Sequence, residues 1–140
     1  MKGIDLLTTY PNAAKVVKEW FMNQMIASMA SDNITPDEFK QAMIDEGISD
    51  ERLGILIDIQ PRTFLDCFDD NKIYIEIQVS SGKNVKFTYF VNRIHFNTIQ
   101  YSTRKEAELE ATDKAFSLLE KQLEPLIFEQ LNKEEENETK

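Results

Sequence analysis

The spacing of hydrophobic residues changes near residue 71, and this change constrains the fold more than any other feature of the chain. Before it, apolar side chains recur every three to four residues, as they do along the buried face of an α-helix. After it, isoleucine and valine alternate with polar or aromatic residues over residues 73–79, which is the period of a half-buried strand. We therefore expect an α+β protein with a helical subdomain over residues 1–70, a β-β-β-α unit over residues 71–124, and a short helix with an acidic flexible tail over residues 125–140.

Capping signals place the helices of the first part. A helix over residues 11–30 begins at a proline, which the first turn of a helix accepts. Thr35 and Glu38 then form a capping box, and Gly47 ends the helix that follows it. Ser49 caps a third, short helix, and one or two further turns precede the strands. These segments should pack together as a helical subdomain.

The second part is expected to hold a three-stranded antiparallel sheet. Its strands are predicted over residues 73–79, 85–91 and 94–101, and Asn92 with Arg93 forms the tight turn between the last two. Because successive side chains of a strand point to opposite faces, one face of this sheet is apolar and should cover the core. The side chains expected on that face are Ile73, Ile75, Ile77, Phe87, Tyr89, Ile94 and Phe96.

A long last helix is predicted to close the core over the sheet. Thr103 opens a second capping box, and small side chains recur four residues apart at Ala107, Ala111 and Ala115. Small residues on that stripe let the helix axis lie close to the sheet. Pro125 should break this helix, because proline lacks the N–H that the helix interior needs.

The chain is acidic overall, but its charge is unevenly distributed. Its 16 Lys and Arg stand against 25 Asp and Glu, for a net charge of -9, which argues against general binding of nucleic acids or anionic membranes. Residues 72–105, however, hold six basic residues and one acidic residue, a net charge of +5, which leaves -14 for the rest. Two interpretations remain open: the acidic helices simply pack beside a basic sheet, or the sheet offers a surface to anions or to an acidic partner.

The face of the sheet opposite the core combines aromatic and basic side chains. Such a set can stack single-stranded bases, and it equally suits a protein interface or a second core layer beneath the N-terminal helices. Whether this face is open or covered decides between these interpretations. The candidate binding residues, together with the basic pair that begins the last helix, are Tyr74, Lys86, Phe90, Arg93, His95, Arg104 and Lys105.

No catalytic or metal-binding motif stands out in the sequence. His95 is the one histidine and Cys67 the one cysteine, which excludes an internal disulfide and a Cys/His zinc cluster. Asp66, Asp69 and Asp70 lack the glycine and distal glutamate of a calcium loop, and a turn that caps the first strand is the simpler interpretation. We expect no cofactor and no metal. An enzyme with carboxylates in a cleft between the two parts is the third hypothesis.

Nothing in the sequence indicates secretion or a membrane. The N-terminus lacks the continuous apolar stretch of a signal peptide, and no run of about 20 apolar residues occurs. A single free cysteine is also what a reducing compartment would tolerate. We therefore expect a cytoplasmic protein that does not bind membranes.

The segment from Tyr101 to Phe116 resembles the last helix of the double-stranded RNA-binding domain. In that family the helix opens with a basic pair, as at Arg104 and Lys105, and carries alanines every four residues. The family's next lysine is replaced here by Glu108, and the first loop between strands reads SSGKN where the family has a Gly-Pro-x-His-like contact. The resemblance therefore implies a β-β-β-α topology rather than RNA binding.

The whole chain also resembles small uncharacterised proteins of bacteriophages and mobile elements, in which a sheet ends in a helix with the pattern Tyr-x-Ser/Thr-x-x-Glu-Ala, here residues 101–107. This resemblance implies an accessory, host-interacting or inhibitory protein in the cytoplasm of a bacterial host. Our leading hypothesis is a non-enzymatic module that binds a protein partner or a second copy of itself. The alternative is a nucleic-acid-binding protein that uses the basic sheet and the start of the last helix.

Overall fold

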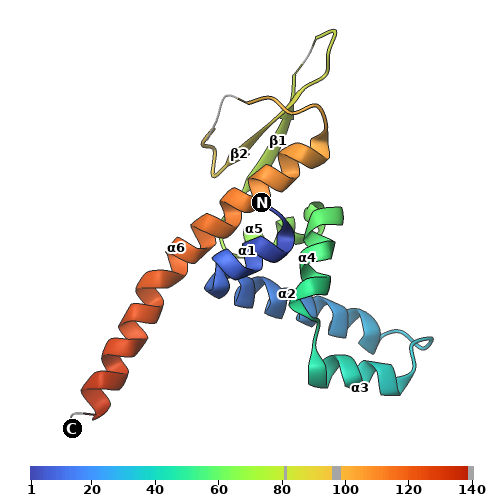
Figure 1. The fold of residues 1–140 in the computed structure, drawn as a ribbon. Coiled ribbons are helices and arrows are strands. Elements are labelled where there is room, and N and C mark those ends of the chain that lie inside the picture. The colour runs from blue at the N-terminus through green and yellow to red at the C-terminus, as the bar shows by residue number, and fades with distance from the viewer. Residues whose placement is uncertain (81, 96–98, 139–140) are drawn as a thin grey trace.

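The computed structural model describes residues 1–80, 82–95 and 99–138, and within the last helix the described side chains reach Leu126 and include Leu131. Short helices come first, a pair of strands follows, and one long helix runs from the sheet across the molecule (Figure 1). The elements are α1 Gly3–Thr9, α2 Pro11–Ala30, α3 Asp37–Glu46, α4 Asp50–Ile59, the 3-10 helix η1 Pro61–Phe64, α5 Leu65–Asp70, β1 Ile75–Val79, β2 Phe87–Val91 and α6 Arg104–Glu138.

The sheet has two strands in the described part of the chain, so the predicted three-stranded sheet was wrong. β1 and β2 pair antiparallel. Asn92 and Arg93 form the predicted tight turn, with positive φ angles of 53° and 65°. Ile94 then pairs back with Val91 as an isolated bridge rather than as part of a described strand.

The register of the returning chain explains why the described residues form no third strand. Tyr101 exchanges backbone hydrogen bonds of 2.8 and 2.9 Å with Phe87. A strand that continued from the turn without interruption would place residue 98 opposite Phe87, three residues before Tyr101. The two isolated pairs therefore belong to different registers. Among the side chains expected to cover the core, Ile94 is instead 55% exposed, and Phe96 lies outside the described residues.

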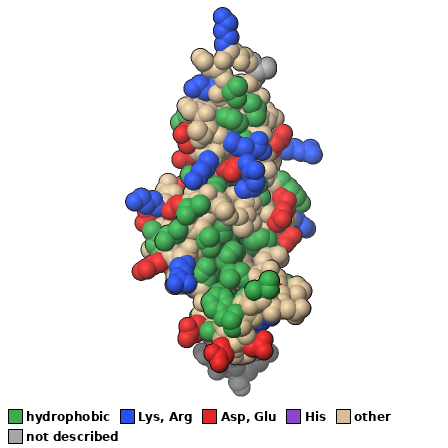
Figure 2. Space-filling view, turned by 90° about the vertical axis from the view of Figure 1, so that its right-hand side faces the viewer, with side chains coloured by type: hydrophobic (Ala, Val, Ile, Leu, Met, Phe, Trp, Pro, Cys, Tyr) green, Lys and Arg blue, Asp and Glu red, His purple; other side chains and the backbone are tan. Residues whose placement is uncertain are grey.

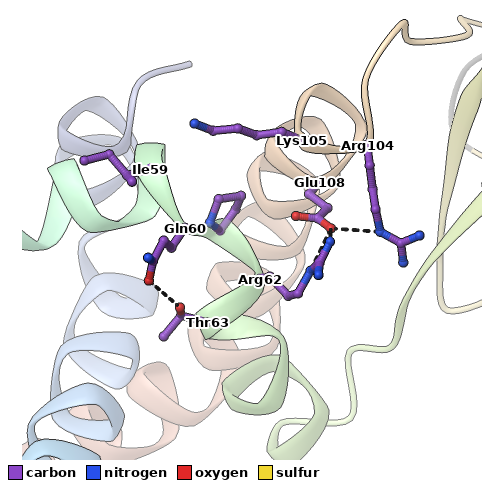
Figure 3. A pocket seen from close by; sticks show the side chains of 8 residues that line it. Ile59, Gln60, Arg62, Thr63, Arg104, Lys105 and Glu108 are labelled. Carbon is purple, nitrogen blue, oxygen red and sulfur yellow. Dashed lines mark hydrogen bonds and ion pairs between the residues drawn. The ribbon is translucent and has the colours of Figure 1, made fainter.

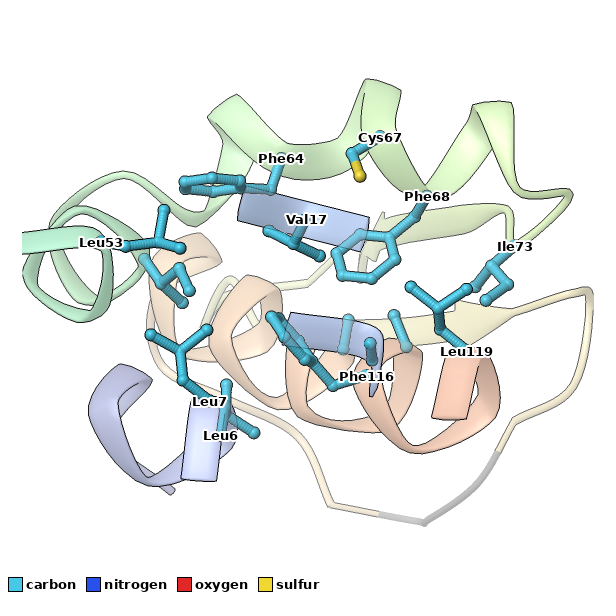
Figure 4. Close-up of a cluster of buried hydrophobic side chains, with 14 of the residues drawn as sticks. Leu6, Leu7, Val17, Leu53, Phe64, Cys67, Phe68, Ile73, Phe116 and Leu119 are labelled. Carbon is cyan, nitrogen blue, oxygen red and sulfur yellow. The ribbon is translucent and has the colours of Figure 1, made fainter. Parts of the chain in front are cut away.

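One hydrophobic core joins the helices to the sheet (Figure 4). The predicted stripe of alanines on α6 is fully buried where this helix packs against the strands. Phe116 of α6 and Phe68 of α5 meet edge to face, with ring centroids 5.5 Å apart. Burying a large apolar side chain stabilises a fold by about 1.5–3 kcal/mol. The largest fully buried apolar side chains include Phe64, Phe68, Phe116, Leu6, Leu53, Ile57, Ile73 and Leu119.

The predicted helices are present, with two differences in detail. The helix expected over residues 11–30 is α2, and the Ser49 hydroxyl caps α4 by accepting the Arg52 N–H at 3.3 Å. Thr35, in contrast, does not cap α3, because its hydroxyl donates to the Asp32 carboxylate in the preceding turn. α1 was not predicted, because its seven residues hold too little of a helical pattern to be recognised.

α6 continues as one helix through Pro125, so the predicted break and the separate short helix were wrong. A proline inside a helix removes one backbone hydrogen bond and costs roughly 3 kcal/mol. The leucine, glutamate and glutamine residues around it are good helix formers and favour a continuous helix. As a result, the C-terminal end of α6 lies away from the other elements (Figure 1).

Candidate binding surfaces

The outer face of the sheet is open rather than covered by the N-terminal helices. Tyr74, just before β1, is 56% exposed, and Phe90 of β2 is partly exposed. The helices contact the sheet from its other side, where Tyr89 and Val91 are buried. The interpretation of the outer face as a second core layer was therefore wrong.

The candidate residues of this face fall into separate groups. Phe90 and His95 stack, with ring centroids 5.0 Å apart and ring planes at 29°. Tyr74 and Arg93 line a hollow of 520 Å³ beside the turn. Lys86 lies at the other end of β2, next to the loop that joins the two strands. The structure thus brings together two pairs of the predicted residues but not the whole set.

Asn92 holds the hollow beside the turn in shape. Its side-chain Oδ1 accepts the Tyr74 N–H at 2.7 Å, and its own N–H donates to the Tyr74 carbonyl at 2.8 Å. Lys72, Arg93 and Glu76 also line this hollow. Two cations and one carboxylate leave a single net positive charge, so the hollow has only a weak attraction for a polyanion.

Arg104 and Lys105 lie in a different hollow, formed by α4, η1 and the start of α6 (Figure 3). This hollow has a volume of 650 Å³. Arg62 of η1 reaches Glu108, one turn into α6, and its Nε and Nη2 donate to the Glu108 Oε1 at 3.1 and 2.9 Å. The Arg104 Nε donates to the same oxygen at 3.2 Å. We call Arg62, Arg104, Lys105 and Glu108 the basic hollow.

Glu108 organises the basic hollow. It is only 4% exposed, whereas the side chains of Arg62 and Arg104 are 66% and 48% exposed. A guanidinium has five N–H donors in a planar fork, and Glu108 takes two from Arg62 and one from Arg104. The N–H groups of Arg62 and Arg104 that do not bind Glu108, together with the Lys105 ammonium, can bind a carboxylate or a phosphate. Three cations and one carboxylate leave the basic hollow with two net positive charges.

Arg62 and Glu108 were not predicted as site residues. They lie 46 residues apart in the sequence, so no local pattern connects them. One signal was present: Glu108 follows Arg104 by four residues, the spacing at which side chains of a helix pair. From the sequence, Glu108 was expected to reduce the basic character of the helix, whereas in the structure it holds the arginines in place.

Exposed apolar side chains extend from the basic hollow across α4 and α3. Ile59 lines the basic hollow and, like Ile55, is 56% exposed. A further hollow of 420 Å³ is lined by Arg52 of α4 and by Phe39 and Met43 of α3, among others. One side of α4 connects the two hollows. Along it, at helical spacing, lie Arg52, Ile55 and Ile59. We call Phe39, Met43, Ile55 and Ile59 the apolar strip.

Figure 2 shows the side of the molecule on which α3 and α4 lie. Hydrophobic side chains gather in its middle and lower part, and a group of Lys and Arg side chains lies above them. Phe39 is 52% exposed, and α3, which is described in full, buries none of its residues. Exposed apolar surface beside arginine is typical of protein interfaces.

Cys67 lies in the core, and residues close to it in the sequence make hydrogen bonds that support the fold. Burial, and next the charge of Asp70, raises the pKa of the Cys67 thiol to about 12, so the thiolate needed for nucleophilic chemistry is absent near neutral pH. Asn71 donates to the Cys67 carbonyl at 2.7 Å and ends α5, while Asp70 accepts the indole N–H of Trp20 at 3.2 Å.

Among the described residues, no group of three or more His, Cys, Asp or Glu side chains is placed to hold a metal ion.

No protein-family model matches the chain, and comparisons with curated proteins and with solved structures find no significant similarity. Within the described ranges, no helix combines the length and the apolar character needed to cross a membrane.

Proposed function

We propose that the protein is a non-enzymatic protein-binding module whose basic hollow and apolar strip together hold an acidic, partly apolar segment of another polypeptide. The main support is the contact of Arg62 and Arg104 with the buried Glu108, in a hollow that the exposed Ile59 also lines. Arginine, methionine and aromatic side chains are enriched in protein interfaces, and the apolar strip adds Phe39 and Met43 to the arginines of the basic hollow. Because Glu108 already holds the two arginines, they lose less conformational freedom when a partner binds.

The pattern of residues 101–107 resembles that of small phage proteins, and we use this resemblance as a guide to the partner. We propose an accessory protein of a phage or mobile element that acts on a host protein in the bacterial cytoplasm, a reducing compartment in which the free thiol of Cys67 is expected. A module of this kind acts by occupying a surface of its partner, and inhibition of a host protein would follow from that.

Quantitative affinity capture from a bacterial lysate tests the proposal. The variant Arg104→Glu with Ile59→Asp alters both parts of the proposed surface. The matched control, Lys15→Glu with Val85→Asp, makes the same changes at exposed positions elsewhere. We expect the first variant to bind the captured partner at least roughly tenfold more weakly, and the control to bind it like the wild type.

The affinity is then measured again with the purified partner, on variants that circular dichroism shows to be folded. Equal binding by the two folded variants would overturn the proposal. The proposal would also be overturned if the wild-type protein captured no partner reproducibly, or captured only proteins that the control variant fails to bind.

A second candidate function, nucleic-acid binding, is favoured by the open outer face of the sheet. Exposed Tyr74 and the stacked Phe90 and His95 offer rings to bases, and Arg93 adds a cation. The net charge of -9 opposes it. A salt titration of binding to single- and double-stranded RNA and DNA, with Arg93→Glu as the variant, tests this candidate. No binding even at low salt would remove it.

A further inference from the structure

The first two residues of α6 are basic, whereas its far end is acidic. Its first turn contributes Arg104 and Lys105 to the basic hollow. From Lys121 to Glu138 it holds six acidic and two basic side chains, a net charge of -4. We call this stretch of α6 the distal segment.

The distal segment extends beyond the core. Leu123 is the last described side chain of α6 that packs against the core. Beyond it, Leu126 and Leu131 are 58% and 54% exposed, and Figure 1 shows this end of the helix standing away from the other elements. In proteins most of the stability of a helix comes from the packing of its apolar side chains, so the distal segment would gain stability from a surface that covers its leucines.

The distal segment has the chemistry that the basic hollow and the apolar strip suit. Its described leucines, Leu126 and Leu131, are apolar like the exposed Ile55 and Ile59. Its net charge of -4 is opposite in sign to the net charge of the basic hollow. The segment rises about 26 Å along its axis, whereas α4 from Arg52 to Ile59 rises about 10 Å. It is therefore long enough to reach along α4 and into the basic hollow.

The two surfaces cannot meet within one molecule. Lys105 and Leu126 lie 21 residues apart on one continuous helix, which places them about 32 Å apart. A helix cannot fold back on its own first turn. The contact therefore requires two molecules.

We propose that the distal segment of one copy docks on the basic hollow and apolar strip of a second copy, in a head-to-tail contact. This inference rests on the proposed use of that surface for protein binding and names a second copy of the chain as the occupant. In such a pair, the copy that supplies its distal segment keeps a free receiving surface, and the other copy keeps a free distal segment. Further copies can add to these free parts, unless the two copies bind reciprocally or a ring closes.

Self-association of the wild-type chain is the first measurement, by multi-angle light scattering and sedimentation velocity over a wide range of concentration. We expect association that increases with concentration and weakens with added salt, because salt screens the charges that face each other in the contact. A protein that stays monomeric at every concentration and salt overturns the inference.

Two variants distinguish the head-to-tail contact from other kinds of association. Arg104→Glu with Ile59→Asp damages the receiving surface and leaves the distal segment intact, whereas Leu126→Asp with Leu131→Asp does the reverse. Each variant alone should self-associate at least roughly tenfold more weakly than the wild type. An equimolar mixture should form a one-to-one complex, because each variant supplies the surface that the other lacks.

Several outcomes of the mixing experiment overturn the inference. If distal segments paired with each other, the two variants would not bind each other, and the variant with the damaged receiving surface would still self-associate. If a different acidic segment occupied the surface, the variant with Leu126→Asp and Leu131→Asp would still self-associate.

Engineered cysteines supply a measurement that does not depend on weakening the fold. A mixture of Ile59→Cys and Leu126→Cys molecules should form a mixed disulfide in the presence of oxidised glutathione, since the native Cys67 is buried. A mixture of Val85→Cys and Leu126→Cys should form far less, and equal yields would count against the contact. If the wild type is monomeric but the Ile59 surface still captures a host protein, the proposed function stands and this inference alone falls.

Discussion

The carboxylate of Glu120 in α6 accepts the backbone N–H of Ala13 in α2 at 2.6 Å, across 107 residues of sequence. Its other oxygen accepts the side-chain amide of Asn12 at 2.9 Å. The first N–H groups of a helix have no acceptor within the helix and carry partial positive charge. Glu120 thus caps α2, where none of the described residues next to the helix supplies a side-chain cap. The contact also joins the start of α2 to α6.

Replacing Glu120 tests the importance of this cap. We expect Glu120→Ala to lower the free energy of unfolding by about 1–2 kcal/mol, because the N–H groups of Asn12 and Ala13 lose a charged acceptor. Glu124→Ala, one turn later at an exposed position, should change it by less than about 0.5 kcal/mol. Urea unfolding followed by circular dichroism compares the two variants. Equal effects would mean that α2 does not depend on the cap.

α1 and α4 cross in backbone contact at Gly3 and Gly54. A Cβ on Gly54 would lie 2.7 Å from the backbone nitrogen of Ile4, which cannot rotate away as a side chain could. We expect Gly54→Ala to destabilise the protein by about 1–3 kcal/mol. Gly82→Ala is the control, because its Cβ would meet no described atom within 4 Å. Thermal unfolding measures both, and a Gly54→Ala protein as stable as the control would show that α1 can move to accommodate the methyl group.

Cys67 should make the protein less stable at alkaline pH. In the folded protein, burial raises its pKa from 9.0 to about 12. Between these values the unfolded chain loses the thiol proton while the folded protein keeps it. The stabilisation is fully present below the unfolded pKa and is lost as pH rises toward the folded one, at up to about 1.4 kcal/mol per pH unit.

Urea unfolding at a series of alkaline pH values measures this effect, with Cys67→Ala as the comparison. We expect the variant to be less stable near neutral pH, because it leaves a small cavity, but to show a shallower decline as pH rises. A decline of the same slope in both proteins would assign the pH dependence to other groups, among them Tyr89, whose pKa burial also raises.

Glu108→Leu separates the contribution of Glu108 to folding from its contribution to binding. An apolar residue of similar size in place of a buried charge often costs little stability, and the half-exposed Arg62 and Arg104 can remain hydrated. We expect a nearly unchanged free energy of unfolding, together with roughly tenfold weaker binding of the partner, because the arginines are no longer held in place. Calorimetric titration with the purified partner measures the binding. Unchanged affinity would mean that the basic hollow does not need Glu108.

Features with a strong local pattern were predictable from the sequence. The Thr103 hydroxyl accepts the Glu106 N–H at 3.1 Å, as the capping box at the start of the last helix predicted. The turn at Asn92 and Arg93 was also predicted, although neither residue is the glycine that such turns favour. Pro125 shows the limit of this approach, because a local rule predicted a break where the surrounding residues sustain a helix.

The candidate site was predictable only in part. From the sequence, Arg104 and Lys105 were predicted as binding residues, but they were grouped with the aromatic face of the sheet. The contact of Arg62 with Glu108, which defines the basic hollow, joins residues 46 positions apart. A pattern of spacing along the chain carries no information about such a pair.

The sequence by itself determined the main helices, the pair of strands, the buried stripe of α6 and the uneven distribution of charge, because each of these depends on residues that are neighbours in the chain. Only the tertiary structure decided that the chain after the turn returns out of register, that the outer face of the sheet is open, and that Glu108 lies between two arginines. Hydrophobic periodicity indicates which side of an element is buried. It does not indicate what that side is buried against, because this depends on how elements distant in the sequence pack together.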